Sequence, residues 1–306
     1  QILNAANAVI SNNIGRKSKS LWTDNGEGEK VNYTLYENGY DEAEGVASGI
    51  AEYVRDGWNY NDVAILYRTN AQSRALEEKL MIHNIPYKIY GGQNFYQRKE
   101  IKDILAYLKT IDNGLDGQAV KRIINVPKRG IGNTTIDRLQ EYADFNDITF
   151  WEALVNAKDI DTIKNAALSK LEPFVDLIGR LRAKEEFMSL KELAEAVIED
   201  TGYIESLSQN ETVEEVEARR ENLDEFINKV VSYEESCKEA GEEPTLSGLL
   251  EEVALIADID NLDESEPHVM LMTLHSAKGL EFPIVYMTGM EDGLFPSYMT
   301  IVSDDS

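Results

Sequence analysis

The sequence is poor in the residues that build disulfide frameworks and metal centres. Among 306 residues it holds one cysteine, Cys237, and three histidines, His83, His268 and His275. A single cysteine excludes a disulfide framework, and so few thiols and imidazoles exclude an ordinary zinc site. We therefore expect no bound structural metal and a protein of a reducing compartment, the cytoplasm.

Long apolar runs and a leader peptide are also missing. No segment approaches the ~20 apolar residues that a membrane helix needs, and the N-terminus lacks the basic stretch and apolar core of a signal peptide. These absences predict a protein that does not use a membrane as a partner. The chain begins at Gln1 in what reads as the middle of a helix, which indicates an excised fragment.

Two motifs of nucleotide hydrolysis are absent. The sequence contains no G-x-x-x-x-G-K-[S/T] phosphate loop and no accompanying acidic motif that would hold a magnesium ion. Because these groups cradle the β- and γ-phosphates, we expect the chain by itself to show no ATP hydrolysis.

Acidic residues outnumber basic ones, and the excess is unevenly placed. The chain has 30 Lys and Arg against 56 Asp and Glu, a net charge of −26. Residues 114–266 hold 16 Lys and Arg and 36 Asp and Glu, a net charge of −20. A nucleic-acid binder usually presents a basic surface, so the overall charge argues against DNA. Residues 68–102 and 119–138 are locally basic, which permits DNA contact there.

Apolar periodicity divides the chain into an α/β part and a helical part. The first third predicts strands over residues 30–36, 63–67 and 87–90, and helices over residues 2–14, 41–56, 72–82 and 98–111. The middle shows only amphipathic helical runs, over residues 161–183, 190–200, 213–240 and 245–257. Strand patterning resumes at His268. The pattern predicts an α/β domain, residues 1–113 and 267–306, interrupted by an all-helical inserted domain, residues 114–266.

The most informative segment is VMLMTLHSAKGLEFPIVY, residues 269–286, followed by GMEDGLFP, residues 289–296. It reads as a buried strand, a polar loop and a second apolar run. In α/β nucleotide-binding domains this arrangement presents functional groups at the carboxyl edge of a sheet. The segment resembles motif V of the UvrD/Rep/PcrA group of superfamily 1 DNA helicases, in which TLHSAKGLEFP is close to a signature.

The resemblance implies a fold and a function. It implies a RecA-like (P-loop NTPase-type) parallel-sheet domain, the second motor domain of an ATP-dependent 3′–5′ DNA helicase or translocase of DNA repair or plasmid replication. Such a domain supplies half of the ATP cleft and part of the DNA track. The implied partners are ATP, single-stranded and duplex DNA, and the first RecA-like domain of the same polypeptide. That first domain would hold the Mg²⁺ ion.

The segment AILYRTNAQSR, residues 64–74, resembles motif IV of the same family. An aromatic ring can stack on a purine, and a guanidinium can bind phosphate oxygens with two donors. By resemblance Tyr67 stacks on adenine, and Arg68 reaches the γ-phosphate as a catalytic arginine finger in cis. Glu281, in the motif V loop, is implied to bind the ribose hydroxyls. Read from the residues alone, Tyr67 could instead cap the core and Arg68 could pair with Glu77 or Glu78.

Three segments carry the residues predicted to contact DNA. The motif V loop contributes Thr273, His275 and Lys278, although an internal ion pair is an equal reading of Lys278. Residues 90–103 mix aromatics with cations, as single-strand sites do, and contribute Phe95 and Arg98, which could equally serve the core and a helix surface. A basic glycine turn can bind phosphate without reading sequence, and this chain has one at Lys128, Arg129, Gly130 and Gly132.

Two other functions fit the same patterns. The chain could belong to a subunit of a helicase–nuclease recombination complex, which a nuclease domain in the full gene would favour. It could also be a non-catalytic acidic scaffold that retains a degenerate motor fold. A parent gene without a phosphate loop would favour the scaffold.

Overall fold

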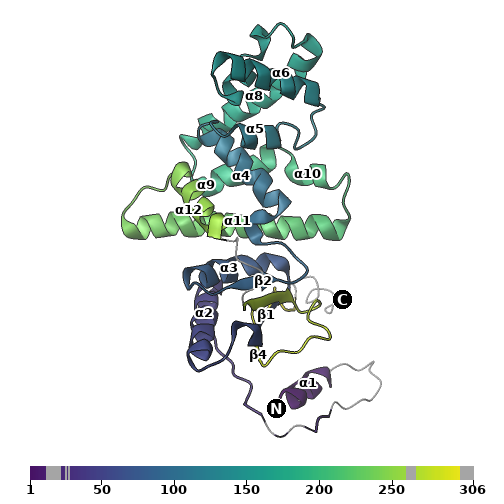
Figure 1. Ribbon diagram of the computed structural model, residues 1–306, viewed down its shortest axis with the longest axis vertical. Helices are drawn as coiled ribbons and strands as arrows, with labels where there is room; N and C mark the ends of the chain where they lie inside the picture. Colours follow the sequence, from purple (N-terminus) through teal and green to yellow (C-terminus); the bar gives the residue numbers. More distant parts are fainter. Residues whose placement is uncertain (12–21, 25, 27, 260–266, 297–306) are drawn as a thin grey trace.

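The computed structural model describes residues 1–11, 22–24, 26, 28–259 and 267–296. A small α/β unit lies at one end of an elongated molecule and a larger helical unit lies at the other (Figure 1). Helix α1, Ile2–Ile10, stands apart at the foot of the α/β unit. None of the described helices is both long enough and apolar enough to cross a membrane.

The α/β unit is built on a parallel sheet, which confirms the predicted fold class. Its strands are β1, Val63–Tyr67, β2, Tyr87–Ile89, β3, Val269–Thr273, and β4, Ile284–Met287. Their order is β2-β3-β1-β4, and every pairing is parallel. The strands on either side of the helical unit therefore meet in one sheet, with β3 inserted between β2 and β1.

Helices α2, Gly39–Arg55, and α3, Ser73–Ile82, cover one face of this sheet. Alternate residues of each strand point toward them, because side chains alternate along a strand. Short 3₁₀ turns precede and follow β1, η1 at Tyr60–Asp62 and η2 at Asn70–Gln72. The buried apolar cluster includes Val63, Ile65, Tyr67, Ile89, Val269 and Leu271 from the strands and Ile50, Leu76 and Leu80 from the helices.

Two details of the first third differ from the sequence predictions. Residues 30–36 form no strand, and Tyr33 and Leu35 are 81% and 82% exposed, because their alternating pattern finds no partner strand to cover it. Helix α2 begins at Gly39, two residues before the predicted residue 41, because Asn38 caps it. The Asn38 side chain accepts from the backbone N–H groups of Tyr40 and Asp41, both at 2.9 Å. The last residues of the predicted helix 2–14 lie outside the described ones.

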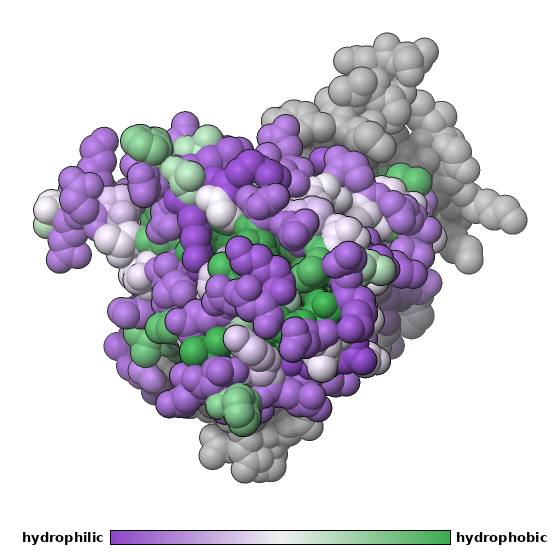
Figure 2. All heavy atoms as spheres, turned by 90° about the horizontal axis from the view of Figure 1, so that it is seen from above, coloured by the Kyte–Doolittle hydropathy of each residue, from purple (hydrophilic) through white to green (hydrophobic). Residues whose placement is uncertain are grey.

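The helical unit contains the helices from α4 to α12. They are α4 Lys99–Asp112, α5 Gly117–Ile123, α6 Asn133–Asn146, α7 Phe150–Val155, α8 Asn165–Glu185, α9 Leu190–Asp200, α10 Tyr203–Leu207, α11 Val213–Ala240 and α12 Leu246–Ile259, with 3₁₀ turns η3 Phe95–Gln97 and η4 Ala157–Asp159. Capping boxes start α7, α9 and α11 at Thr149, Ser189 and Thr212. Seen from the distal end, hydrophilic residues cover most of the surface and hydrophobic ones gather in strips between them (Figure 2).

The apolar core of the helical unit begins earlier than the predicted residue 114. Phe95, Tyr96 and the buried residues of α4, such as Ile101 and Ile104, pack with the helices that follow them. The apolar periodicity of residues 98–111 predicted a helix, but it could not show whether that helix packs against the sheet or against the helices that follow it. The change of core therefore lies near Phe95, while the division of the chain into domains stays a prediction.

A buried polar joint connects the two units. We use this name for the face of α11 that carries Glu221, Asn222, Glu225 and Lys229, together with the residues of α3 and η3 that it contacts. Helix α11 lies across the α3 end of the α/β unit (Figure 1). Its four polar residues recur at helical spacing, so they share one side of the helix.

Arg74 of α3 is the centre of the joint. Its side chain is 1% exposed, and it donates to Glu78 Oε1 at 2.9 Å and to Glu225 Oε1 at 2.8 Å. Glu78 also accepts from the Tyr96 hydroxyl at 2.6 Å and lies 3.4 Å from Lys229 Nζ. Burial opposes the charge of Arg74, but these carboxylates raise its pKa above the ordinary value. Charged side chains of α3 thus pair with charged side chains of α11, and removing one of them would take an ion-pair partner from the other helix.

Prediction for the joint: Arg74→Ala should lower the free energy of unfolding by about 3–5 kcal/mol, because it leaves Glu225 without its cation and Glu78 with Lys229 alone. Urea unfolding of the purified chain measures this. Arg55→Ala, which removes an exposed surface pair with Glu52, should change stability by no more than about 0.5 kcal/mol. Equal stability losses in the two variants would contradict a central role for Arg74.

Candidate functional site

The carboxyl edge of the sheet brings two predicted segments together. Strands β1 and β3 are parallel neighbours in a register that sets Tyr67 beside Thr273. The Leu274 N–H donates to the Tyr67 carbonyl at 2.8 Å, so the pairing continues to the ends of both strands. Arg68 follows β1 directly, and His275 comes two residues after the last residue of β3. Two residues more than two hundred positions apart in the sequence thus emerge at one edge.

The Arg68 side chain contacts the His275 ring. Arg68 Nη1 lies 3.2 Å from His275 Nδ1, and His275 is exposed. A guanidinium has only donors, so Nδ1 must be the acceptor and the ring proton lies on Nε2. The pair therefore presents the remaining N–H groups of Arg68 and the Nε2–H of His275. This arrangement of donors and one fixed positive charge is suited to a phosphate or carboxylate.

The turn that carries Arg68 is held by Gln72. The Gln72 Oε1 atom accepts from the backbone N–H groups of Arg68 and Thr69, both at 2.9 Å. Gln72 is not among the residues predicted for the site. Its signal was available, because Thr69 and Gln72 form the T-x-x-Q pattern of a capping box.

A second turn, after β4, packs against the Gln72 side chain at Gly289. Gly289 has φ +66°, and a Cβ there would lie 2.0 Å from Gln72 Nε2. The Gly289 N–H donates to the Glu42 carboxylate at 3.1 and 3.2 Å. Burial raises the pKa of Glu42, the Gly289 N–H opposes this, and Glu291 adds to it. Glu42 and Gly289 were also missed, because neither is near Arg68 in the sequence.

Tyr67 does not face this edge. Its ring is 0% exposed within the core between the sheet and its helices. Burial and the nearby Glu77 raise its pKa, and its hydroxyl has no hydrogen-bond partner among the described residues. Both faces of the ring are covered, so stacking on adenine would require the side chain to leave the core. The position matches the alternative reading, in which Tyr67 caps the core.

Arg68 does not pair with Glu77 or Glu78, because other cations occupy those carboxylates. Arg74 and Lys229 contact Glu78, and Arg98 Nη2 lies 3.8 Å from Glu77. The alternative reading of Arg68 as an internal ion pair with these residues is therefore not what the structure contains.

Phe95 and Arg98 lie in the joint and not on the surface. Phe95 is 0% exposed, and the Arg98 guanidinium stands 5.0 Å from its ring centre. Arg98 is 7% exposed and donates to Asn222 Oδ1 at 2.7 Å and to Ser73 Oγ at 2.8 Å. Burial lowers the pKa of Arg98. In this arrangement neither side chain has a face free for DNA, because the cation that looked available in the sequence is used internally.

In the rest of the motif V loop, Thr273 is hydrogen-bonded within the loop, whereas Lys278 and Glu281 are exposed. The Thr273 hydroxyl lies 2.9 Å from Ser276 Oγ and accepts from the Ser276 N–H at 3.2 Å, so it shapes the start of the loop. Lys278 is exposed and makes no ion pair within the described part of the chain. Glu281 is also exposed. It belongs to the last part of the loop, which ends where Ile284 pairs with Val63 at the opposite end of β1.

In the basic glycine turn only one of the two cations is free. Arg129 donates to the carbonyls of Ile123 and Ile124 at 2.9 and 3.2 Å and to the Tyr107 hydroxyl at 2.6 Å. Its guanidinium also lies 4.9 Å from the Phe174 ring centre. Lys128 is exposed. Arg129 therefore holds the turn in place, and Lys128 is the side chain available to a ligand.

A small hollow of 210 Å³ adjoins this turn. Lys170 of α8 lines it and donates to the Gly130 carbonyl at 2.8 Å. Gly132 is the N-cap of α6 and provides no side chain to cap the helix. The first turn of α6 and the Lys170 ammonium thus lie close together, a combination that favours an anion.

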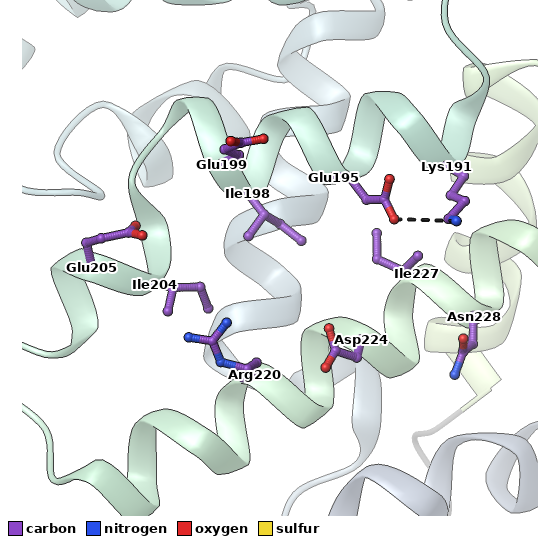
Figure 3. Close-up of a pocket in the computed structure, with 10 residues that line it drawn as sticks. All are labelled: Lys191, Glu195, Ile198, Glu199, Ile204, Glu205, Arg220, Asp224, Ile227 and Asn228. Carbon is purple, nitrogen blue, oxygen red and sulfur yellow. Dashed lines mark ion pairs between the residues drawn. The ribbon is translucent and has the colours of Figure 1, made fainter.

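A larger hollow of 460 Å³ lies between α9, α10 and α11 (Figure 3). Its apolar residues are Ile198, Ile204 and Ile227, and an ion pair between Lys191 and Glu195 stands on its border. It contains none of the predicted site residues. The hollow belongs to the helical unit alone, and we assign it no role in the site at the sheet edge.

The all-parallel sheet and the polar loop that follows β3 place the chain in a class, the α/β proteins built on a RecA-like sheet. A family model described as UvrD-like helicase C-terminal domain matches residues 1–305. Since the match extends over almost the whole chain, the chain belongs to this family.

The similar proteins are more specific. The chain is 48% identical over 304 residues to ATP-dependent DNA helicase PcrA of Staphylococcus aureus (strain Mu50 / ATCC 700699), and 46% identical over 304 residues to the protein of the same name in Staphylococcus epidermidis (strain ATCC 12228 / FDA PCI 1200). Each alignment covers 99% of this chain and 41% of the relative. The chain thus corresponds to less than half the length of the PcrA helicases that it resembles.

Prediction for the turn at Gly289: Gly289→Ala should destabilise the chain by roughly 1 kcal/mol more than Gly279→Ala. Both glycines have positive φ, but a Cβ at Gly279 meets open space and one at Gly289 displaces Gln72. Thermal unfolding of the two variants measures the difference. Identical losses would show that Gln72 yields freely and does not hold the Arg68 turn.

Proposed function

We propose that this chain is the second motor domain, with its inserted helical unit, of a PcrA-like ATP-dependent DNA helicase. The observation that carries the proposal is the contact between Arg68 and His275 at the carboxyl edge of the sheet. Motor domains of the parallel-sheet type bind their ligands at this edge. Family membership and the identity to PcrA support the same assignment.

The Arg68–His275 pair is proposed to bind a phosphate group. The donors, the fixed charge and the exposure of His275 fit such a group, and Gln72 fixes the turn beneath it. The phosphate has two sources in a helicase, the γ-phosphate of ATP and the backbone of single-stranded DNA. Under this proposal Glu281 binds the ribose of the nucleotide and Lys278 a further phosphate. The groups around the β-phosphate and Mg²⁺ belong to the rest of the polypeptide.

A separate duplex contact is proposed at the basic glycine turn. Lys128 and the backbone of Gly130–Gly132 would bind phosphate there, with Lys170 adding charge from α8. Such contacts position a duplex without reading its sequence. The turn lies in the helical unit, away from the sheet edge, so the two contacts are independent.

Prediction for the sheet edge: Arg68→Ala in the intact helicase should weaken one phosphate interaction. If the ligand is the γ-phosphate, kcat for ATP falls on the order of 10³-fold while single-strand affinity is kept. If the ligand is DNA, single-strand affinity falls and its salt slope decreases by about 0.7, with kcat kept at saturating DNA.

Arg180→Ala removes an exposed cation from α8 and serves as the control for charge. ATPase assays and oligonucleotide titrations at several salt concentrations separate the two sources. Normal values for both ligands in a folded Arg68→Ala protein would overturn the proposed phosphate site.

Prediction for the glycine turn: Lys128→Ala should lower duplex affinity and reduce the salt slope by about 0.9, the effect of one phosphate contact. Single-strand-stimulated ATPase should be unchanged. Arg129→Ala should instead lower thermal stability, because that side chain holds carbonyls of its own loop. An unchanged duplex salt slope in Lys128→Ala would mean that the turn only starts a helix.

A further inference from the structure

The turn after β4 is fixed to the strand that carries Arg68. The Leu66 carbonyl of β1 accepts from the Thr288 N–H at 2.9 Å and from the Thr288 hydroxyl at 3.3 Å. Thr288 is 5% exposed, so these bonds are shielded from water. Gly289 follows directly and is buried. The backbone of this turn thus lies against β1 two residues before Arg68.

Glu42 of α2 holds the same turn from the side of the helix. Both oxygens of its carboxylate lie within hydrogen-bond distance of the Gly289 nitrogen, at 3.1 and 3.2 Å. When the carboxylate is ionised, such a bond is roughly twice as strong as one between neutral groups. The nearby Ala43, Val46 and Ala47 are buried in the core of the α/β unit, which fixes this part of α2. The helix therefore provides a rigid anchor for the turn.

The Gln72 amide connects Gly289 to Arg68. A Cβ at Gly289 would overlap Gln72 Nε2, so the amide fills the space that a side chain would need. The oxygen of the same amide accepts from the backbone N–H groups of Arg68 and Thr69, both at 2.9 Å. The last torsion of a glutamine side chain has a broad energy minimum, so it needs contacts to fix it. Contact with Gly289 thus keeps the amide oxygen directed at the Arg68 turn.

We infer that Glu42 is a positioning residue for Arg68. It acts at a distance, through the Gly289 turn and the Gln72 amide. Without the carboxylate the buried Gly289 N–H loses its partner, the turn shifts and the amide is free to rotate. The Arg68 backbone then leaves the orientation from which its guanidinium reaches His275 at 3.2 Å. This inference rests on the proposed phosphate site and adds to it a residue that lies outside the site.

The test is Glu42→Ala in the intact helicase, with ATP and a single-stranded oligonucleotide as probes. The relevant quantity is the one that Arg68→Ala lowers, either kcat for ATP or affinity for the single strand. We expect Glu42→Ala to lower the same quantity by a smaller factor, about tenfold for kcat, because a displacement of ~1 Å can cost ~10²-fold. Glu42→Gln keeps a neutral oxygen acceptor for the Gly289 N–H and should retain most of the lost function.

Glu44→Ala is the matched control, because Glu44 is a carboxylate of the same helix that pairs with Lys79 at 3.0 Å and with His83 at 2.7 Å. Its loss removes contacts between α2 and α3 and leaves the hydrogen bond to Gly289 in place. We expect Glu44→Ala to lower thermal stability and to leave kcat and single-strand affinity unchanged. A merely structural role for Glu42 would give the same result in Glu42→Ala, so thermal unfolding and both assays are measured on each variant.

Gln72→Met tests the middle of the connection without altering α2. Methionine keeps the length of the side chain beside Gly289 but offers only a weak acceptor to the two N–H groups, whereas Gln72→Glu keeps a strong one. Gln72→Met should therefore lower the quantity that Arg68→Ala lowers, and Gln72→Glu should retain most of it. Adding Glu42→Ala to Gln72→Met should cause little further loss, because the two residues act in series.

The outcomes separate this inference from the proposed function. If Arg68→Ala changes the response to neither probe, the proposed phosphate site fails and this inference fails with it. If Arg68→Ala lowers one quantity and Glu42→Ala behaves like Glu44→Ala, the phosphate site stands and the positioning role is overturned. A loss in Glu42→Ala that adds in full to the loss in Arg68→Ala would also overturn that role, since the carboxylate would then act elsewhere.

Discussion

The buried pairing of Arg74 with Glu78 and Glu225 is the interaction on which the rest of the structure depends. A charge removed from water is tolerated only when partners are placed around it, so the two units can meet in few relative orientations. An apolar contact would let α11 shift along α3, whereas these polar groups find their hydrogen-bond and ion-pair partners in only one relative position of the two helices. The joint therefore sets the direction in which the helical unit leaves the α/β unit.

Whether this chain can contact phosphate depends on which of its cations are exposed, more than on its net charge. A net charge of −26 argues against DNA binding, and the locally basic segments were expected to compensate for it. The structure shows that Arg74, Arg98 and Arg129 in those segments serve buried partners. The exposed cations at the proposed contacts are few, Lys128 and Lys278 among them. Contact with phosphate would therefore depend on position more than on overall charge.

The sequence located the strands of the sheet and most of the longer helices, but it also suggested a strand over residues 30–36 that does not form, and it did not show which elements pack together. The apolar runs at residues 63–67 and 269–273 predicted β1 and β3, and the carboxyl-edge rule for parallel sheets explains why Arg68 and His275 meet. The sequence left the burial of Tyr67 and Phe95 as one of two alternatives, because an aromatic residue beside cations has the same pattern on a surface and in a core. The roles of Arg98 and Arg129 depend on Asn222 and Tyr107, which are distant in the sequence.

The chain leaves the sheet after β2 and returns at β3, and these two strands are adjacent. A connection between neighbouring parallel strands ordinarily needs only a dozen or so residues and one helix. Here the whole helical unit occupies the place of that one connection. Homologous genes can therefore gain or lose residues between α5 and α10 without changing the strand order. The segments that contact α3 have no such freedom, so length variation should concentrate far from the sheet.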